Sequence, residues 1–432
     1  MTATPLRLLC IEPWFPGRLG GVADWLVRHR GYHCWFFAAH IEPRERWPAS
    51  IDHGLNVIQF SVGGVARQPT VRWQQLLERG LCYAYGCWEV LDKRRPSPLD
   101  LVLGRSAGLG SNLFAPVVHP RIPLVNFCDY FIRPRTGDLT AEIAPDAPPA
   151  YFQWRRSANA MDLLDLENGT RAWTPTAWQR DTYPAEYRDE FLVLPDGIDP
   201  LPLADPSPRE RRIADRTIPA GMRVVTFVAS SLDRLRGFDR YLRLCADLLQ
   251  HRSDVICIAL GNPIVQHALE TEFYQEDYAR QLLERSPLPN PDRFWMLGHV
   301  PPATVAQVLA ASDLHVSPSR PYPVSRSLLE ALSAGCTVLA ADEEPAREIL
   351  THGQTGLLIP ADAPEAWLAA ANAVLDDPAG HRPLGRTAAE MVRERYSRDA
   401  TLPVLAEKFT QLVQDAENCR WTDADSLMRE AR

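Results

Sequence analysis

Several features that would point to particular protein classes are missing from this 432-residue sequence. No Cys-x-x-Cys occurs among its nine cysteines, of which Cys82 and Cys87 are the closest pair, and no histidines have the H-E-x-x-H spacing. We therefore expect no metal site and no disulfide framework, and a reducing, cytoplasmic setting. No apolar run approaches the roughly 18 residues of a membrane-spanning helix. The apolar run at 6–11 lacks the layout of a secretory leader.

An excess of positive charge is also absent. The 46 Lys and Arg residues are outnumbered by 54 Asp and Glu residues, which gives a formal net charge of −8. A broad nucleic-acid surface needs positive charge, so we expect no nucleic-acid partner, although a local basic loop can still bind phosphate groups. Apolar residues make up 46% of the chain and charged residues 23%, which is typical of globular domains.

Strand and helix patterns alternate along both halves of the chain. Short apolar runs are separated by segments whose apolar residues recur every three or four positions, the period of a half-buried helix. This alternation predicts an α/β fold with parallel sheets covered by helices on both faces. Strands are expected at 6–13, 32–40, 55–62, 99–106, 122–130, 223–230, 254–262, 294–300, 314–319 and 336–342, and helices at 20–31, 73–88, 237–250 and 302–312.

A stretch rich in proline and charge separates the two halves and suits a linker. Open α/β sheets bind ligands at the carboxyl ends of their strands, so each half offers a candidate site there. The architecture alone does not name a reaction. The expected division is a first domain over 1–199, a linker over 200–222, a second domain over 223–392, and a charged helical segment over 393–432 that can cross back to the first domain.

Two loops between a strand and a helix are candidate anion sites. Arg236 stands just before a helix start, where its guanidinium and the backbone N–H groups can bind phosphate oxygens. The alternative is that Arg234 and Arg236 form surface ion pairs with Asp233 and Asp239. In the first half, the glycines of "FPGRLGG" allow close approach of a ligand to the backbone. They fit a turn followed by a helix cap equally well, and they do not form a dinucleotide-binding fingerprint.

The stretch "RPYPVSRSLLEALSAG" (320–335) also allows two interpretations. Ser327 and Glu330 match the S-x-x-E capping box of a helix start. A carboxylate at that place can instead accept hydrogen bonds from the two vicinal hydroxyls of a ribose. The local pattern does not decide between them.

These motifs, in this order, resemble glycosyltransferase family 4, whose members are retaining enzymes of the GT-B fold that use nucleotide-sugar donors. The segment from "VSPSRPYP" to "TGLLIP" (316–360) is similar to the signature of the family's second domain. "LRGFDRYL" is similar to its donor loop, and "VLPDGID" to the segment that closes its first domain. "TPTAWQRDTYPAEYRDEF" resembles one branch in particular. The resemblance covers nearly the whole chain.

The resemblance implies two Rossmann-like domains that face each other across a cleft, with the acceptor on the first domain and the nucleotide sugar on the second. It places Gly20 and Gly21 in a first-domain loop that faces the donor diphosphate. Its implied donor-binding residues are Arg236 at the diphosphate, Glu330 at the ribose, Ser325, Arg326 and Ser327 at the diphosphate or sugar, Ser230 and Ser231 in the donor loop, and His299 and Val300 at the base.

Three positions depart from the family pattern. Tyr322 stands where the first glutamate of the E-x7-E pair is expected, Ser230 where an arginine is expected, and Arg105 where a first-domain histidine is expected. Asp129 fills the acidic position in "NFCDYF" (126–131). We take Arg105, Asp129 and Tyr322 as the candidate catalytic residues, with Arg105 as a cation for the leaving diphosphate.

The expected activity is metal-independent, retaining transfer of a sugar from a nucleoside diphosphate sugar to a glycan, a lipid-linked glycan or a small acceptor, without a cofactor. The three departures motivate an alternative, a non-catalytic or altered relative that binds nucleotide or glycan and acts with a partner enzyme. A weaker option is epimerisation or phosphorolysis on the same fold. Peripheral contact with the inner membrane stays open. The first domain is rich in aromatic residues that can contact a lipid-linked acceptor, but residues of this type more often belong to the core. They are Trp25, Trp35, Phe36, Phe37 and Trp47.

Overall fold

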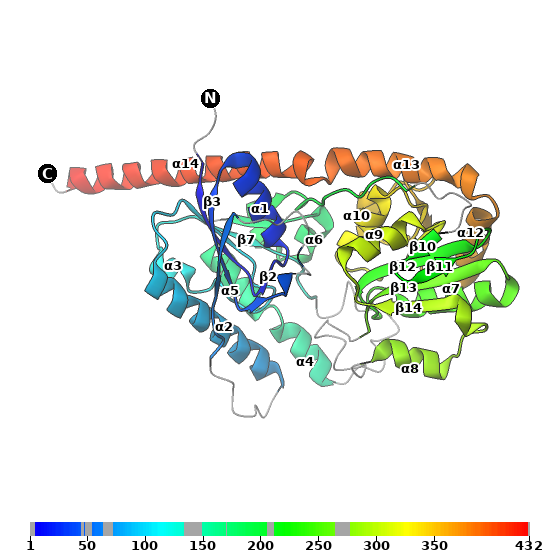
Figure 1. Ribbon diagram of the computed structural model, residues 1–432. Coiled ribbons are helices and arrows are strands. Elements are labelled where there is room, and N and C mark those ends of the chain that lie inside the picture. The colour runs from blue at the N-terminus through cyan, green and yellow to red at the C-terminus, as the bar shows by residue number, and fades with distance from the viewer. Residues whose placement is uncertain are drawn as a thin grey trace. The chain divides into compact units, whose positions relative to one another are not determined.

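The chain folds into two α/β units (Figure 1). This computed structural model describes residues 5–44, 47, 54–63, 72–133, 149–169, 171–204, 211–263 and 277–430. Unit 1 comprises Met1–Gly197 and Arg398–Arg432, and unit 2 comprises Ile198–Ser397.

Unit 1 contains a seven-stranded parallel sheet with the strand order β5-β3-β1-β6-β7-β8-β9. Its strands are β1 (Arg7–Ile11), β3 (His33–Ala38), β5 (Leu55–Gln59), β6 (Leu101–Gly104), β7 (Leu124–Phe127), β8 (Arg171–Thr174) and β9 (Phe191–Val193). Its helices are α1 (Leu19–Arg30), α2 (Arg72–Arg94), α3 (Ala115–Val118), α4 (Pro149–Ser157), α5 (Ala160–Asn168), α6 (Ala177–Thr182) and α14 (Arg398–Glu430), with a 3-10 turn at Ala185–Glu190.

The alternating side chains of β1 supply the cores on both faces of this sheet. Leu8 and Cys10 join a core with residues of α1 and α14, whereas Leu9 and Ile11 join a second core with residues of α2. A strand that is buried on both faces must be apolar throughout, which explains the uninterrupted run that predicted it. Helix α1 ends at Gly31, whose φ of 68° is the left-handed geometry expected of a helix-terminating glycine.

The first-domain aromatics belong to the core, as their residue type suggested. Trp25, Phe36 and Phe37 are buried. Trp35 and Trp47 are half-buried and pack against the two cores of unit 1. They therefore give no support to membrane contact. Across the described ranges, no helix is both long enough and apolar enough to cross a bilayer.

Unit 2 contains a six-stranded parallel sheet with the strand order β14-β13-β12-β15-β16-β17. Its strands are β12 (Arg223–Ser231), β13 (Val255–Asn262), β14 (Phe294–Gly298), β15 (Leu314–Ser317), β16 (Val338–Ala341) and β17 (Leu357–Ile359). Its helices are α7 (Phe238–His251), α8 (Tyr278–Arg285), α9 (Pro302–Ala310), α10 (Arg326–Ser333), α11 (Glu344–Ile349), α12 (Pro364–Asp376) and α13 (Pro378–Arg395), with a 3-10 turn at Pro291–Arg293. Val225 and Phe227 of β12 pack with α7 and α12, and Val224 packs with α9 on the other face.

The predicted linker differs from the structure. Its described part contains a hairpin of β10 (Arg211–Ile213) and β11 (Arg216–Ile218), which belongs to unit 2. Ile213 and Ile218 are fully buried in a core of that unit. The proline- and charge-rich composition concealed these two apolar positions. Residues 205–210 lie outside the described residues.

The boundary near the C-terminus also differs from the expected position. The segment expected from residue 393 begins instead at Arg398, because α13 continues to Arg395 within unit 2. Helix α14 belongs to unit 1, where Leu402, Leu405 and Phe409 enter the core shared with α1. A late segment of the chain thus completes the first unit.

Candidate functional site

Glu12 holds the loop that follows β1 at the start of α1. Its carboxylate accepts hydrogen bonds from the backbone N–H groups of Arg18 and Leu19, at 3.0 and 2.9 Å. The N–H groups at a helix start have no acceptor within the helix, and the carboxylate provides one. Its negative charge is also stabilised by the positive end of the helix dipole. Gly17 has a φ of 51° and lies against this carboxylate, where a Cβ would collide with it. Burial raises the pKa of Glu12, and the charge of Arg105 opposes that rise.

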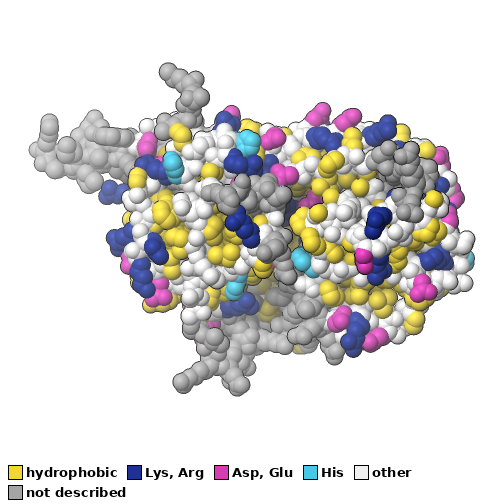
Figure 2. All heavy atoms as spheres, in the orientation of Figure 1, with side chains coloured by type: hydrophobic (Ala, Val, Ile, Leu, Met, Phe, Trp, Pro, Cys, Tyr) yellow, Lys and Arg dark blue, Asp and Glu magenta, His cyan; other side chains and the backbone are white. Residues whose placement is uncertain are grey.

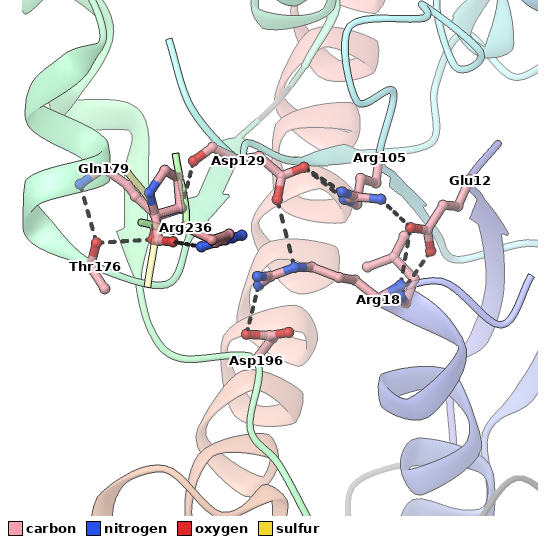
Figure 3. A network of polar contacts seen from close by, with 10 residues as sticks. Glu12, Arg18, Arg105, Asp129, Thr176, Gln179, Asp196 and Arg236 are labelled. Atoms are coloured by element: carbon pink, nitrogen blue, oxygen red, sulfur yellow. Dashed lines mark hydrogen bonds and ion pairs between the residues drawn. The ribbon is translucent and has the colours of Figure 1, made fainter. Parts of the chain in front are cut away.

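Arg105 lies between two carboxylates (Figure 3). It follows β6, and its guanidinium donates to Glu12 and, through Nε and Nη2, to Asp129 at 2.8 and 2.7 Å. The two predicted catalytic residues of the first half are therefore brought into contact. Arg105 therefore has a structural role within unit 1, because its guanidinium holds the carboxylates of Glu12 and Asp129 in place.

Arg18 extends this network, and the sequence patterns did not single it out. Its Nη1 donates to Asp196 at 3.1 Å, and its Nε lies 3.7 Å from Asp129 (Figure 3). Its guanidinium also lies 5.5 Å from the ring centre of Phe127. Two arginines thus join three carboxylates at the carboxyl edge of the sheet, the edge at which ligands of such sheets bind.

The "PTAWQ" segment (175–179) holds the backbone of Asp129 in place. Thr176 caps α6 by accepting from the backbone N–H of Gln179 at 3.2 Å. The buried side chain of Gln179 donates to the backbone carbonyl of Asp129 at 2.5 Å. Tyr130 stacks on Trp178, with ring centres 5.6 Å apart. This segment therefore positions the loop that carries Asp129.

Gly20 and Gly21 do not lie in a loop, contrary to the prediction. Both are in the first turn of α1 and are buried. A Cβ on Gly21 would collide with the guanidinium of Arg398, so its small size is explained by packing against α14. The turn itself is made by Gly17.

In unit 2, the donor loop between β12 and α7 is built around Asp233. This buried carboxylate accepts from the hydroxyl of Ser231 and from the backbone N–H of Arg236 at 2.9 Å. Gly237 then turns the chain with a φ of 78°, packed so closely on the carbonyl of Pro318 that a Cβ would not fit. Ser230 is exposed at the end of β12, whereas Ser231 is buried and its hydroxyl is directed to the interior.

Arg236 contacts the segment that precedes α10. Its Nη1 donates to the carbonyl of Pro323 at 3.0 Å, and its guanidinium lies 5.2 Å from the ring centre of Tyr322. The structure thus brings together two predicted residues that are distant in sequence.

For Asp239, the structure shows an ion pair that differs from the alternative interpretation. Asp239 is bound instead by both terminal nitrogens of the buried Arg320, at 2.9 and 2.8 Å. Arg320 also donates to the carbonyl of Arg234. Its side chain therefore fixes the donor loop to the segment before α10.

Of the two interpretations of the segment at α10, the capping box is wrong. Ser325 is the cap, because its hydroxyl accepts from the N–H of Leu328 at 3.2 Å. Ser327 is the second residue of the helix, and its hydroxyl donates to Ser325 at 3.0 Å. Glu330 is the fifth residue and is half-buried. Capping therefore does not explain Glu330, and the ribose interpretation stays a prediction.

The remaining predicted residues of unit 2 lie at the edges of these elements. Arg326 is the first, half-buried residue of α10. His299 and Val300 follow β14 after a turn at Gly298, whose φ is 69°. His299 is exposed, whereas Val300 is half-buried and packs against the core. Among the residues that the structure describes, no three His, Cys, Asp or Glu side chains are grouped to hold a metal ion.

Solved glycosyltransferases share this fold. Sucrose-phosphate synthase from Thermosynechococcus elongatus superposes with a TM-score of 0.70 over 95% of this chain and 100% of that chain, at 16% identity. Anabaena HepE in complex with UDP and glucose gives 0.66 over 94% and 100%, at 18% identity. Such likeness shows the fold, which is that of the two-domain GT-B proteins.

The family follows from sequence comparison. Residues 30–201 match the model of the glycosyl transferase family 4 group, and residues 209–391 match that of glycosyl transferases group 1. The chain belongs to this family of glycosyltransferases.

Three curated relatives illustrate its range. D-inositol 3-phosphate glycosyltransferase of Kineococcus radiotolerans is 30% identical over 54% of each chain. Alpha-maltose-1-phosphate synthase of Mycolicibacterium smegmatis is 28% identical over 50% of this chain and 55% of its own. The chain thus spans about half the length of these two relatives. Lipopolysaccharide core biosynthesis mannosyltransferase LpcC of Rhizobium leguminosarum is 24% identical over 94% of this chain and 97% of its own.

Proposed function

We propose that this protein transfers a glycosyl group from a nucleoside diphosphate sugar to a glycan, a lipid-linked glycan or a small acceptor. The observation that carries the proposal is the contact of Arg236 with Pro323, two residues before the cap of α10. A guanidinium beside a helix N-terminus combines a full positive charge with oriented N–H donors, which suits a diphosphate. This is the chemistry that a nucleotide-sugar donor requires.

The position of Glu330 fits the rest of such a donor. It lies four residues after Arg326 on the same helix, a rise of about 6 Å at 1.5 Å per residue. A diphosphate at the N-terminus of α10 and a ribose beside Glu330 would then bind along one helix. The carboxylate would accept hydrogen bonds from the two ribose hydroxyls, while the exposed His299 lies in the loop assigned to the base.

The proposed reaction retains the anomeric configuration and requires neither a metal nor a cofactor. As the bond between the sugar and the diphosphate breaks, negative charge develops on the diphosphate. Arg236 and the N-terminus of α10 stabilise that charge without moving. The departing phosphate accepts the proton of the attacking acceptor hydroxyl, so no strong protein base is needed.

Unit 1 would bind the acceptor at the carboxyl edge of its sheet. Asp129 is held by Arg105, yet 26% of its side chain stays exposed, so its carboxylate can accept a hydrogen bond from an acceptor hydroxyl. We expect Arg105 to act by fixing Asp129, rather than as the cation for the diphosphate that the sequence suggested.

A nucleic-acid partner is not expected. Charged side chains of both signs are interspersed over the face in Figure 2, which suits a small-molecule enzyme better than a nucleic-acid binder. A cytoplasmic setting is part of the proposal, and it rests on the scattered spacing of the nine cysteines, which contains no Cys-x-x-Cys. Peripheral membrane contact stays an untested prediction.

The test is calorimetric titration of the purified chain with UDP-, GDP- and ADP-sugars, followed by turnover assays. Arg236→Ala and Glu330→Ala should each weaken donor binding by about 1.5–3 kcal/mol, the contribution of hydrogen bonds to charged groups. Arg280→Ala is the matched control in unit 2, because Arg280 pairs only at the surface with Glu284. If no nucleoside diphosphate sugar binds or turns over, the proposal is wrong.

The second candidate is a family member that binds donor without transferring the sugar. Tyr322 favours it, because this aromatic ring contacts Arg236 where the family pattern has a carboxylate. Donor binding with no turnover against a broad acceptor panel would establish this alternative.

A further inference from the structure

Among the tryptophans whose side chains the structure describes, Trp14 alone is exposed. Its exposed fraction is 37%, whereas the others are buried or half-buried. Its neighbour Phe15 is fully buried in the core. Trp14 lies between Glu12 and Arg18, on the loop that carries both of these network residues from β1 to α1.

The backbone under Trp14 is held in place. Strand β2 (Trp14–Phe15) pairs in parallel with β4 (His40–Ile41), and Trp14 is aligned with His40. The N–H groups of Ala39 and His40 donate to the carbonyl of Pro13, at 3.1 and 2.9 Å. This ladder joins the loops that leave the carboxyl ends of β1 and β3.

Side-chain contacts also fix the orientation of the indole. It stacks on His40, with ring centres 6.0 Å apart and planes at 26°. His40 Nε2 is hydrogen bonded at 2.8 Å to the hydroxyl of the buried Tyr83 on α2. The guanidinium of Arg79 lies 5.8 Å from the ring centre of Tyr83. Three segments of the chain therefore orient one exposed indole.

Packing accounts for only part of this arrangement, because 37% of Trp14 stays exposed. Apolar surface that stays in water gains no burial free energy, so the exposed part of the indole adds little to stability. Single exposed apolar residues are common on protein surfaces, but an indole whose orientation is already fixed by other side chains offers a ligand a preformed contact. The carboxyl edge of the sheet, where Trp14 and Asp129 both stand, is where such a ligand would bind.

We infer that Trp14 is the stacking platform of a carbohydrate subsite in unit 1. The inference rests on the proposed function and names the kind of group that the acceptor presents there. A pyranose ring has a face of C–H groups that packs on an indole, and a rim of hydroxyls that needs hydrogen-bond partners. His40 stacks on the indole and provides polar ring nitrogens beside it, and the backbone N–H of Glu42 donates to the carbonyl of the neighbouring Phe15 at 2.9 Å. An acyl chain would not use these groups, so the surroundings favour a sugar ring.

The test uses the full chain and four probes, the methyl glycosides of mannose, glucose, galactose and N-acetylglucosamine, in saturation-transfer NMR. We expect at least one glycoside to bind the wild type. Trp14→Ala should weaken this binding by about tenfold, in line with the loss of stacking on an aromatic side chain, and Trp14→Phe should retain most of it. Val117→Ala is the control, because Val117 is an exposed apolar residue of α3 in the same unit.

Equal binding by wild type and Trp14→Ala, or no glycoside binding by either, would overturn the inference. Calorimetric titration of both proteins with UDP, GDP and ADP keeps the two proposals distinguishable. Trp14→Ala should bind nucleotide as the wild type does. Glycoside binding that depends on Trp14, together with failure of nucleotide binding and transfer, would remove the proposed function and leave the subsite in place.

Discussion

Gln179 donates a hydrogen bond of 2.5 Å to the backbone carbonyl of Asp129. Asp129 in turn binds Arg105, which binds Glu12, which caps α1. The side-chain amide of Gln179 is therefore the first member of a series of contacts that connects α6 to α1 within unit 1.

Substitution of Gln179 should impair the acceptor side of the reaction. Gln179→Met keeps the length of the side chain but removes the N–H donor, and loss of a buried hydrogen bond costs about 1–3 kcal/mol. We expect a fall of about tenfold in kcat/KM for the acceptor, with unchanged donor affinity. Steady-state kinetics with each substrate varied in turn measures this. A proportionate loss of donor affinity would instead indicate general unfolding.

Removal of Arg105 should destabilise unit 1 more than removal of an exposed arginine. Arg105→Met leaves Glu12 buried without its cation, which costs about 3–5 kcal/mol in free energy of unfolding. Addition of Glu12→Gln should recover part of this loss, because the unpaired charge is then absent. Urea denaturation of both variants measures the coupling. Arg171→Ala, which breaks an exposed pair with Glu190, should cost below about 1 kcal/mol.

Much of the fold could be predicted because its signals are local. The apolar runs of β1 and β12 predict strands that are buried on both faces, and Gly31 marks the end of α1. The hairpin at 211–218 could not be predicted, since two isoleucines among charged residues form no clear period. Its stability comes from the core of unit 2, which local sequence does not reveal.

The site could be predicted only in part, for a similar reason. Arg236 was found because its loop has a recognisable form. Arg320 and Arg18 were missed because their carboxylate partners stand 81 and 178 residues away in the chain. The capping-box interpretation places the cap of α10 two residues too late, because "SRS" offers two serines and only the backbone geometry selects Ser325.

This assignment of the cap can be checked directly. Ser325→Ala should lower the free energy of unfolding by about 0.5–2 kcal/mol, the usual effect of losing an N-cap side chain. Ser327→Ala removes a hydroxyl that donates only to Ser325, so its effect should be smaller. Denaturant titration of the two variants compares them under identical conditions. A larger effect at Ser327 would restore the rejected capping box.

His315 should make unit 2 sensitive to acid. It is buried on β15, with Nδ1 3.0 Å from the hydroxyl of Thr226, and burial lowers its pKa to about 3. The unfolded chain, with a histidine pKa of about 6.5, binds more protons than the folded chain between these values, so stability falls as the pH drops below about 6.5. From pH 7 to pH 5 the loss should reach about 2 kcal/mol. His315→Asn lacks the titrating group and should not show this loss in urea titrations at the two pH values.

Asp165 should give unit 1 the opposite dependence. This carboxylic acid is buried on α5, and burial raises its pKa to about 7 although a hydrogen bond from Ser106 opposes the rise. The folded chain therefore holds this proton more tightly than the unfolded chain, whose aspartate pKa is about 3.9. The stabilisation is complete below that value and is lost as the pH rises towards 7. Between pH 5 and pH 8 wild type should lose about 2.7 kcal/mol relative to Asp165→Asn, whose amide stays neutral. Urea titrations of both proteins across this range measure the difference, and a constant difference would mean that Asp165 is ionised throughout.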